Sequence, residues 1–170
     1  MWRRPAKQTN KIIFDAQVEA IAHGRTTVAS EYLLSALLRD VIAVESIWPP
    51  TPTDRLDTQD IIAVLLYEAG ANLEQLKAEV QHQVTLLDIP CSRDAMTPSA
   101  IHVLNTMYEE AKRISVVSIT PEFLFLALIR DTEGTPGQVL AQFGLEIETA
   151  RQKVDAIYES MANITDAAPH

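Results

Sequence analysis

Apolar residues recur along the chain with the period of an α-helix. In residues 12–20, and again in residues 103–111, they stand at i, i+1, i+4 and i+8, which places them on one helix face. Serine, threonine and asparagine residues stand where such helices would begin. The pattern predicts eight helices, at about residues 9–23, 30–40, 60–69, 72–86, 97–114, 120–131, 135–143 and 146–161.

Signals for helix starts are clear, whereas signals for strands are nearly absent. Three threonine–proline pairs predict a hydroxyl at the N-cap and proline at the first helical position: Thr97-Pro98, Thr120-Pro121 and Thr135-Pro136. The best strand candidate, residues 115–119, is too short and has no partner strand in sequence. The fold class is therefore predicted to be all-α.

The chain contains an internal duplication. A shift of 91 residues places Glu19 over Glu110 and continues without a gap to Asp40. The register resumes at a shift of 74, with Gly70 over Gly144, so the first copy carries an insertion of 91 − 74 = 17 residues. We expect two pseudo-symmetric four-helix repeats in one domain. The predicted ranges are 1–170 for the domain, 9–87 for the first repeat with an insertion at about 41–60, and 96–161 for the second repeat.

Charge, hydropathy and cysteine content indicate which partners and which compartment to expect. With 14 Lys+Arg against 23 Asp+Glu, the net charge is −9, so the surface repels phosphate backbones and a nucleic-acid partner is not expected. No apolar run approaches the roughly 20 residues of a bilayer span, so no membrane partner is expected either. The basic start, from Arg3 to Lys11, lacks an apolar signal region and is interpreted as a solvated face or a frayed end. A single cysteine, Cys91, fits a reducing compartment, so the cytoplasm is expected, or the plastid stroma for a mature plastid form.

The residues with reactive side chains do not form a recognisable site. The glycine-rich stretch 134–138 has no lysine to complete a phosphate-binding loop, and the four histidines have no second ligand at metal-binding spacing. Cys91 has no histidine within ten residues except His82 to act as a base, and it is interpreted as an incidental thiol. We therefore expect no catalytic residue, no metal and no cofactor, and a chain that is not an enzyme unless a site forms from residues far apart in sequence.

The repeated boxes resemble a known family. The second copy reads Thr-Pro at 97–98, Glu-Glu-Ala-Lys-Arg at 109–113 and Ile-Thr-Pro-Glu-Phe-Leu at 119–124, and residues 28–34 match the last box in the first copy. Over residues 9–158 the chain resembles the Clp repeat of the N-terminal domain of Clp-type AAA+ unfoldases, most like the ClpC and ClpA branch. The resemblance fits either a fragment of an unfoldase or a free-standing accessory protein, and the divergent boxes and basic start favour the second.

The resemblance implies a function in protein binding. In that family the double repeat docks adaptor and substrate proteins and passes them to an ATPase ring that feeds a protease. It implies a non-catalytic interaction module of a Clp chaperone–protease system, whose partners are Clp unfoldase or protease subunits, adaptors or substrates. The alternative is a regulatory protein of the same fold that senses a peptide or small ligand outside proteolysis. The oligomeric state is left open.

Five residues are candidates for partner binding: Glu31, Tyr32, Trp48, Glu122 and Phe123. In some ClpC proteins the box glutamates bind phosphoarginine, and Glu31 and Glu122 match them. The alternative is that both acids complement helix dipoles, because Pro121 removes a donor that an anion would need. Tyr32 and Phe123 fit core or groove-lining positions better than ligand contacts.

Trp48 lies in the insertion and precedes Pro49-Pro50. It either packs over the core or anchors a partner from a proline-bracketed loop. For the second case we predict that deletion of residues 46–56 leaves the fold intact and weakens partner binding.

Overall fold

The computed structural model describes residues 4–41, 58–89 and 93–166, and Trp48, Cys91 and most of the predicted insertion lie outside this range. The predicted all-α class with eight helices is confirmed within it. Most helices begin and end within two residues of the prediction, and the last runs further, to Asp166. The helices are α1 Lys7–Ala22, α2 Ser30–Arg39, α3 Thr58–Glu68, α4 Leu73–Thr85, α5 Pro98–Arg113, α6 Pro121–Arg130, α7 Thr135–Gln142 and α8 Ile147–Asp166.

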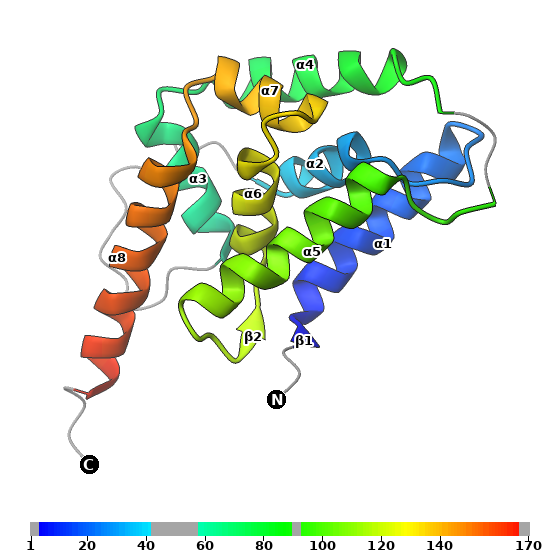
Figure 1. Cartoon of the computed structure of the whole chain (residues 1–170). Helices are drawn as coiled ribbons and strands as arrows, with labels where there is room; N and C mark the ends of the chain where they lie inside the picture. Colours follow the sequence, from blue (N-terminus) through cyan, green and yellow to red (C-terminus); the bar gives the residue numbers. More distant parts are fainter. Residues whose placement is uncertain (1–3, 42–57, 90–92, 167–170) are drawn as a thin grey trace.

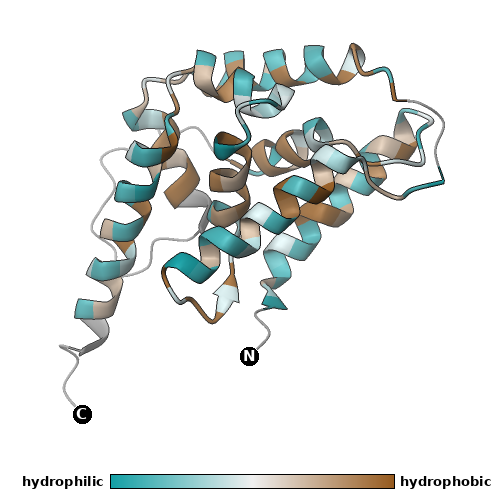
Figure 2. Cartoon of the chain, in the orientation of Figure 1, coloured by the Kyte–Doolittle hydropathy of each residue, from teal (hydrophilic) through white to brown (hydrophobic). Residues whose placement is uncertain are grey.

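Helices α2 and α6 lie at the centre of the molecule, and the remaining helices surround them (Figure 1). Each packs against the first helix of its own repeat and also against helices of the other repeat. Every side chain from Ser30 to Leu38 and from Pro121 to Ile129 is buried. Apolar colour concentrates on the central helices, and polar colour on the outer faces (Figure 2). The two repeats therefore share one core, built around two largely apolar helices that are buried on all sides.

Local signals account for several helix ends. The Thr97 hydroxyl accepts a hydrogen bond from the Ala100 amide, as predicted, and Gly70 and Gly144 end helices with φ of +72° and +88°. A Cβ on Gly144 would lie 2.8 Å from the Ala69 carbonyl oxygen, so this glycine also lets the repeats approach closely. The prediction for Thr135 was wrong: Gly134 is the N-cap residue of α7, and Thr135 is already helical.

Two short parallel strands correct the expectation that residues 115–119 have no partner. Strand β1, Arg4–Pro5, pairs with β2, Ser118–Ile119, so this part of the basic start is ordered rather than frayed. An isolated bridge joins Val28 to Met96, and the 91-residue shift maps this pair onto Ile119 and Pro5. The segment before the first helix of each repeat thus pairs with the loop before the second helix of the other repeat. This reciprocal exchange joins the halves about a pseudo-two-fold axis.

No described helix has the length and apolar character needed to cross a membrane.

Candidate functional site

The two box glutamates point into the protein. The Oε1 atom of Glu122 accepts hydrogen bonds from the Thr120 hydroxyl, at 2.6 Å, and from the Tyr158 hydroxyl. Burial, and then the negative charge of Glu122, raise the pKa of Tyr158 above its ordinary value. In the first repeat, the Ser30 hydroxyl lies 3.4 Å from Glu31 Oε2. Both acids lie in the first turn of a central helix, where the helix dipole favours them.

The aromatic residues that follow these acids are fully buried. Tyr32 and Phe123 have no exposed surface, and Phe123 packs against Tyr158 with ring centroids 5.7 Å apart. In this conformation neither these rings nor Glu122 offers a surface to a partner. The role of the four box residues in partner binding therefore stays a prediction, as does that of Trp48, which lies outside the described residues.

Each repeat also holds a buried glutamate that was not among the five predicted site residues. Glu19 of α1 accepts hydrogen bonds from the Ser35 hydroxyl at 2.9 Å, from Arg39 at 2.8 Å and from the Gln81 amide at 3.3 Å. It therefore ties α1 to α2 and α4. Its counterpart Glu110 ties α5 to the equivalent helices α6 and α8.

Glu110 is surrounded by arginines. Its carboxylate accepts hydrogen bonds from Arg151 Nε at 3.0 Å, from Arg113 at 3.3 Å and from Arg130 at 3.3 Å. Burial disfavours its charge, but the hydrogen bonds and charges of Arg151 and Arg113 outweigh burial and lower the pKa of Glu110. The 91-residue match of Glu19 with Glu110, and of Arg39 with Arg130, is the sequence signal that could have revealed both clusters.

An apolar stripe runs along the outer face of α1. Phe14, Val18 and Ile21 are spaced i, i+4 and i+7 and are 61%, 47% and 68% exposed. The 91-residue shift places Asn105, Glu109 and Lys112 at the equivalent positions of α5, where all three are also exposed. The fold accepts polar residues on this face, so packing within the chain does not require the stripe.

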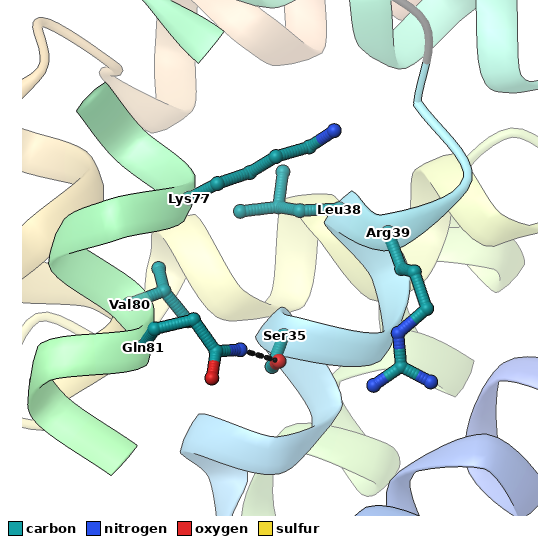
Figure 3. Close-up of a pocket in the computed structure, with 6 residues that line it drawn as sticks. All are labelled: Ser35, Leu38, Arg39, Lys77, Val80 and Gln81. Atoms are coloured by element: carbon teal, nitrogen blue, oxygen red, sulfur yellow. Dashed lines mark hydrogen bonds between the residues drawn. The ribbon is translucent and has the colours of Figure 1, made fainter. Parts of the chain in front are cut away.

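A cavity of about 180 Å³ lies between α2 and α4 (Figure 3). Its lining combines apolar side chains, neutral polar groups and two cations, contributed by Ser35, Leu38, Arg39, Lys77, Val80 and Gln81. The Gln81 amide donates a hydrogen bond of 2.7 Å to the Ser35 hydroxyl, and Lys77 extends across the cavity over Leu38 (Figure 3). The composition suits a small group that is partly apolar and partly anionic.

A second cavity, of about 210 Å³, lies between α3 of the first repeat and the α7–α8 region of the second. Lys153 and Glu68, on its rim, form an ion pair of 2.7 Å that links the repeats. Two of its charged side chains are thus already paired with each other. Among the residues that the structure describes, no three His, Cys, Asp or Glu side chains gather as a metal site would require.

Comparison with known proteins confirms the resemblance to the Clp repeat. Residues 95–169 match the family model of the Clp repeat N-terminal domain. The chaperone protein ClpB of Oceanobacillus iheyensis and the competence regulator ClpC/MecB of Bacillus subtilis are each 25% identical to 91% of the chain. The chloroplastic chaperone ClpC of Pisum sativum is 27% identical over 97% of it. The chain spans about 16–17% of the length of these relatives.

Solved structures share the fold. The N-terminal domain of Hsp104 from Candida albicans superposes with a TM-score of 0.63 at 12% identity and covers 89% of both chains. The N-terminal domain of ClpD from Arabidopsis thaliana superposes with a TM-score of 0.60 at 16% identity, over 92% of this chain and 95% of that domain. The eight-helix architecture of the chain is therefore the fold of these N-terminal domains.

Proposed function

From the match to the Clp repeat N-terminal domain family, we propose that the chain is a non-catalytic protein-interaction module of a Clp chaperone–protease system. Its partners are the Clp ring, adaptors or substrate proteins. The relatives are bacterial and chloroplastic Clp proteins, which supports a place in the cytoplasm or the plastid stroma.

The exposed stripe on α1 supports the interaction role and is the surface that we propose for it. Phe14, Val18 and Ile21 form a continuous apolar strip on an outer helix, whereas the duplicate helix is polar at all three positions. Exposed apolar strips that packing does not require mark surfaces that bind other proteins.

The charges beside the stripe indicate the chemistry of the partner segment. Lys7 lies seven residues before Phe14, on the same helix face, and forms no ion pair with another described residue. The acid beside the stripe, Asp15, is paired with Lys11 at 2.7 Å. A partner segment with apolar side chains along the stripe and an acidic side chain beside Lys7 complements this face. The net charge of −9 opposes a second copy of the chain as the occupant.

A binding assay tests the proposal with three purified probes: the Clp unfoldase ring of the same organism, its adaptor, and carboxymethylated α-lactalbumin as a permanently unfolded, acidic substrate. Fluorescence anisotropy of the labelled chain measures each affinity. The double variant Phe14→Ser/Ile21→Ser is compared with the control variant Asn105→Ser/Lys112→Ser on the duplicate face. Degradation by the complete Clp protease, with and without added chain, gives an independent functional readout.

We expect the native chain and the control variant to bind at least one probe and to change the degradation rate. The stripe variant should lose about tenfold or more in affinity, since two buried apolar anchors are removed. Equal affinity of both variants would refute the proposal that the α1 stripe binds the partner. Absence of binding by the native chain to every probe, with an unchanged degradation rate, would refute the Clp role.

A further inference from the structure

We propose that the cavity between α2 and α4 is a binding site for a carboxylate carried on a small branched apolar group. Such a group is found at the C-terminus of a peptide that ends in leucine or valine, and also in a free branched short-chain acid. The site is separate from the α1 stripe and does not depend on the Clp role.

Comparison of the two repeats explains why a cavity exists here. The residues equivalent to Ser35 and Lys77 are Leu126 and Arg151 in the second repeat. Leu126 is fully buried, and Arg151 reaches across to the buried Glu110. In the first repeat, serine is shorter than leucine, and the Lys77 ammonium bonds the Val41 carbonyl oxygen at 3.4 Å. The space that leucine and arginine occupy in one repeat is thus left open in the other.

The cations of the cavity have capacity for an anion. Lys77 forms no ion pair with any described acid, and its one hydrogen bond, to Val41, is long. Arg39 donates through Nη2 to Glu19, while its Nη1 and Nε make no hydrogen bond to another described residue. Glu19 itself already accepts hydrogen bonds from Ser35, Gln81 and Arg39. A carboxylate beside Lys77 would therefore gain a charge-assisted hydrogen bond without displacing the buried acid.

Size and lining restrict the ligand further. A volume of about 180 Å³ is below the roughly 300–1,000 Å³ typical of sites for drug-sized ligands, so the cavity suits one group of side-chain size. Leu38 and Val80 supply an apolar surface for a branched aliphatic group, and Lys77 extends over Leu38, where the carboxylate of that group can reach its ammonium (Figure 3). A fully polar anion such as phosphate would leave these aliphatic side chains without a partner.

Titration of the whole chain with small probes tests the site in the absence of any Clp protein. The probes are isovalerate, N-acetyl-leucine, its neutral analogue N-acetyl-leucinamide, and a pentapeptide ending in leucine with a free or an amidated C-terminus. Binding is followed by NMR through the Gln81 side-chain amide and the Ser35 backbone amide. Two variants address the cavity: Lys77→Met removes the cation, and Ser35→Leu fills the space with the residue of the second repeat. Lys112→Met is the matched control on an exposed face of α5.

We expect the free carboxylates to bind the native chain saturably. The affinity should be about tenfold weaker or more for the amides, and also for the carboxylates with the variant Lys77→Met. This is the loss typical of one charge-assisted hydrogen bond. Ser35→Leu should abolish binding while the chain stays folded, and Lys112→Met should bind as the native chain does. Tighter binding of the pentapeptide than of isovalerate would assign the site to peptide C-termini, and the reverse to free acids. Equal affinity for acid and amide, or unchanged binding by Ser35→Leu and Lys77→Met, would overturn the proposal.

Discussion

Replacement of Glu110 by glutamine removes the negative charge from the centre of the second repeat while keeping the volume of the side chain. Only 1% of the glutamate side chain is exposed, and it accepts hydrogen bonds from Arg113, Arg130 and Arg151. In the variant Glu110→Gln, the amide oxygen still accepts hydrogen bonds. The amide NH₂ group, however, faces arginine donors, and three cations lose their common counter-ion.

The size of the stability loss depends on how well water can solvate the three arginines after the substitution. Removal of one partner from a fully buried ion pair costs about 3–5 kcal/mol. Here Arg151, Arg113 and Arg130 are 21%, 32% and 42% exposed, so each is solvated in part after the change. We therefore expect a loss of about 2–3 kcal/mol in the free energy of unfolding, within the range for hydrogen bonds to charged groups.

Denaturant unfolding at neutral pH measures this loss against two matched variants. Glu109→Gln changes the neighbouring residue, which is 63% exposed and pairs with Arg130 alone, so it should cost about 0.5 kcal/mol or less. Glu19→Gln removes the counterpart in the first repeat, which has one arginine and two neutral donors, and should cost less than Glu110→Gln.

The pH dependence gives a second test of the same cluster. Because folding lowers the pKa of Glu110, its contribution to stability is present above the unfolded pKa of about 4.3 and is lost as pH falls through the folded value. The stability difference between the native chain and Glu110→Gln should therefore shrink as the solution is acidified below about pH 5. A loss no larger than that of Glu109→Gln, or a difference that stays constant with pH, would refute the reasoning.

Three further predictions concern two single positions and the insertion of the first repeat. Ser115 has φ +58° where the first repeat has Gly24 at φ +71°, so Ser115→Gly should raise the free energy of unfolding by about 0.5–1 kcal/mol, and a lower midpoint would contradict this. Tyr158→Phe removes a hydrogen-bond donor from buried Glu122 and should lower the free energy of unfolding by about 1–3 kcal/mol. An unchanged free energy of unfolding would contradict this. Deletion of residues 46–56 should leave the circular dichroism spectrum and unfolding midpoint unchanged and weaken binding in the anisotropy assay; unchanged affinity would exclude Trp48 as an anchor.

The helices could be predicted because their signals are local. Apolar periodicity, the Thr97 cap and the glycines at 70 and 144 each act within a few residues, and the duplication allowed the two repeats to be checked against each other. Of the other two predicted caps, Thr120 is the N-cap residue but its hydroxyl makes no cap hydrogen bond, and Thr135 is helical. The strands could not be predicted in this way. Each has two residues, and Pro5 pairs with Ile119 far along the chain, so the pairing follows from the pseudo-two-fold arrangement rather than from local sequence.

The candidate site was harder to predict than the fold. In an amphipathic helix, the apolar face identifies buried residues, but α2 and α6 are buried on all sides, so sequence cannot distinguish a box glutamate inside the core from one that faces solvent. The α1 stripe was also missed, since the buried and exposed apolar residues of that helix alternate along the sequence. The cavity beside Lys77 could not be predicted because it depends on how side chains of two helices, α2 and α4, fill the space between them.

Hydrogen–deuterium exchange, measured with and without the bound partner from the anisotropy assay, tests the central claim most directly, because it locates the contact without any substitution. We predict that backbone amides of residues 14–21 in α1 become protected on binding, while those of residues 105–112 in α5 exchange at the same rate as in the free chain. Protection confined to α5, or an unchanged α1 in a saturated complex, would contradict the account.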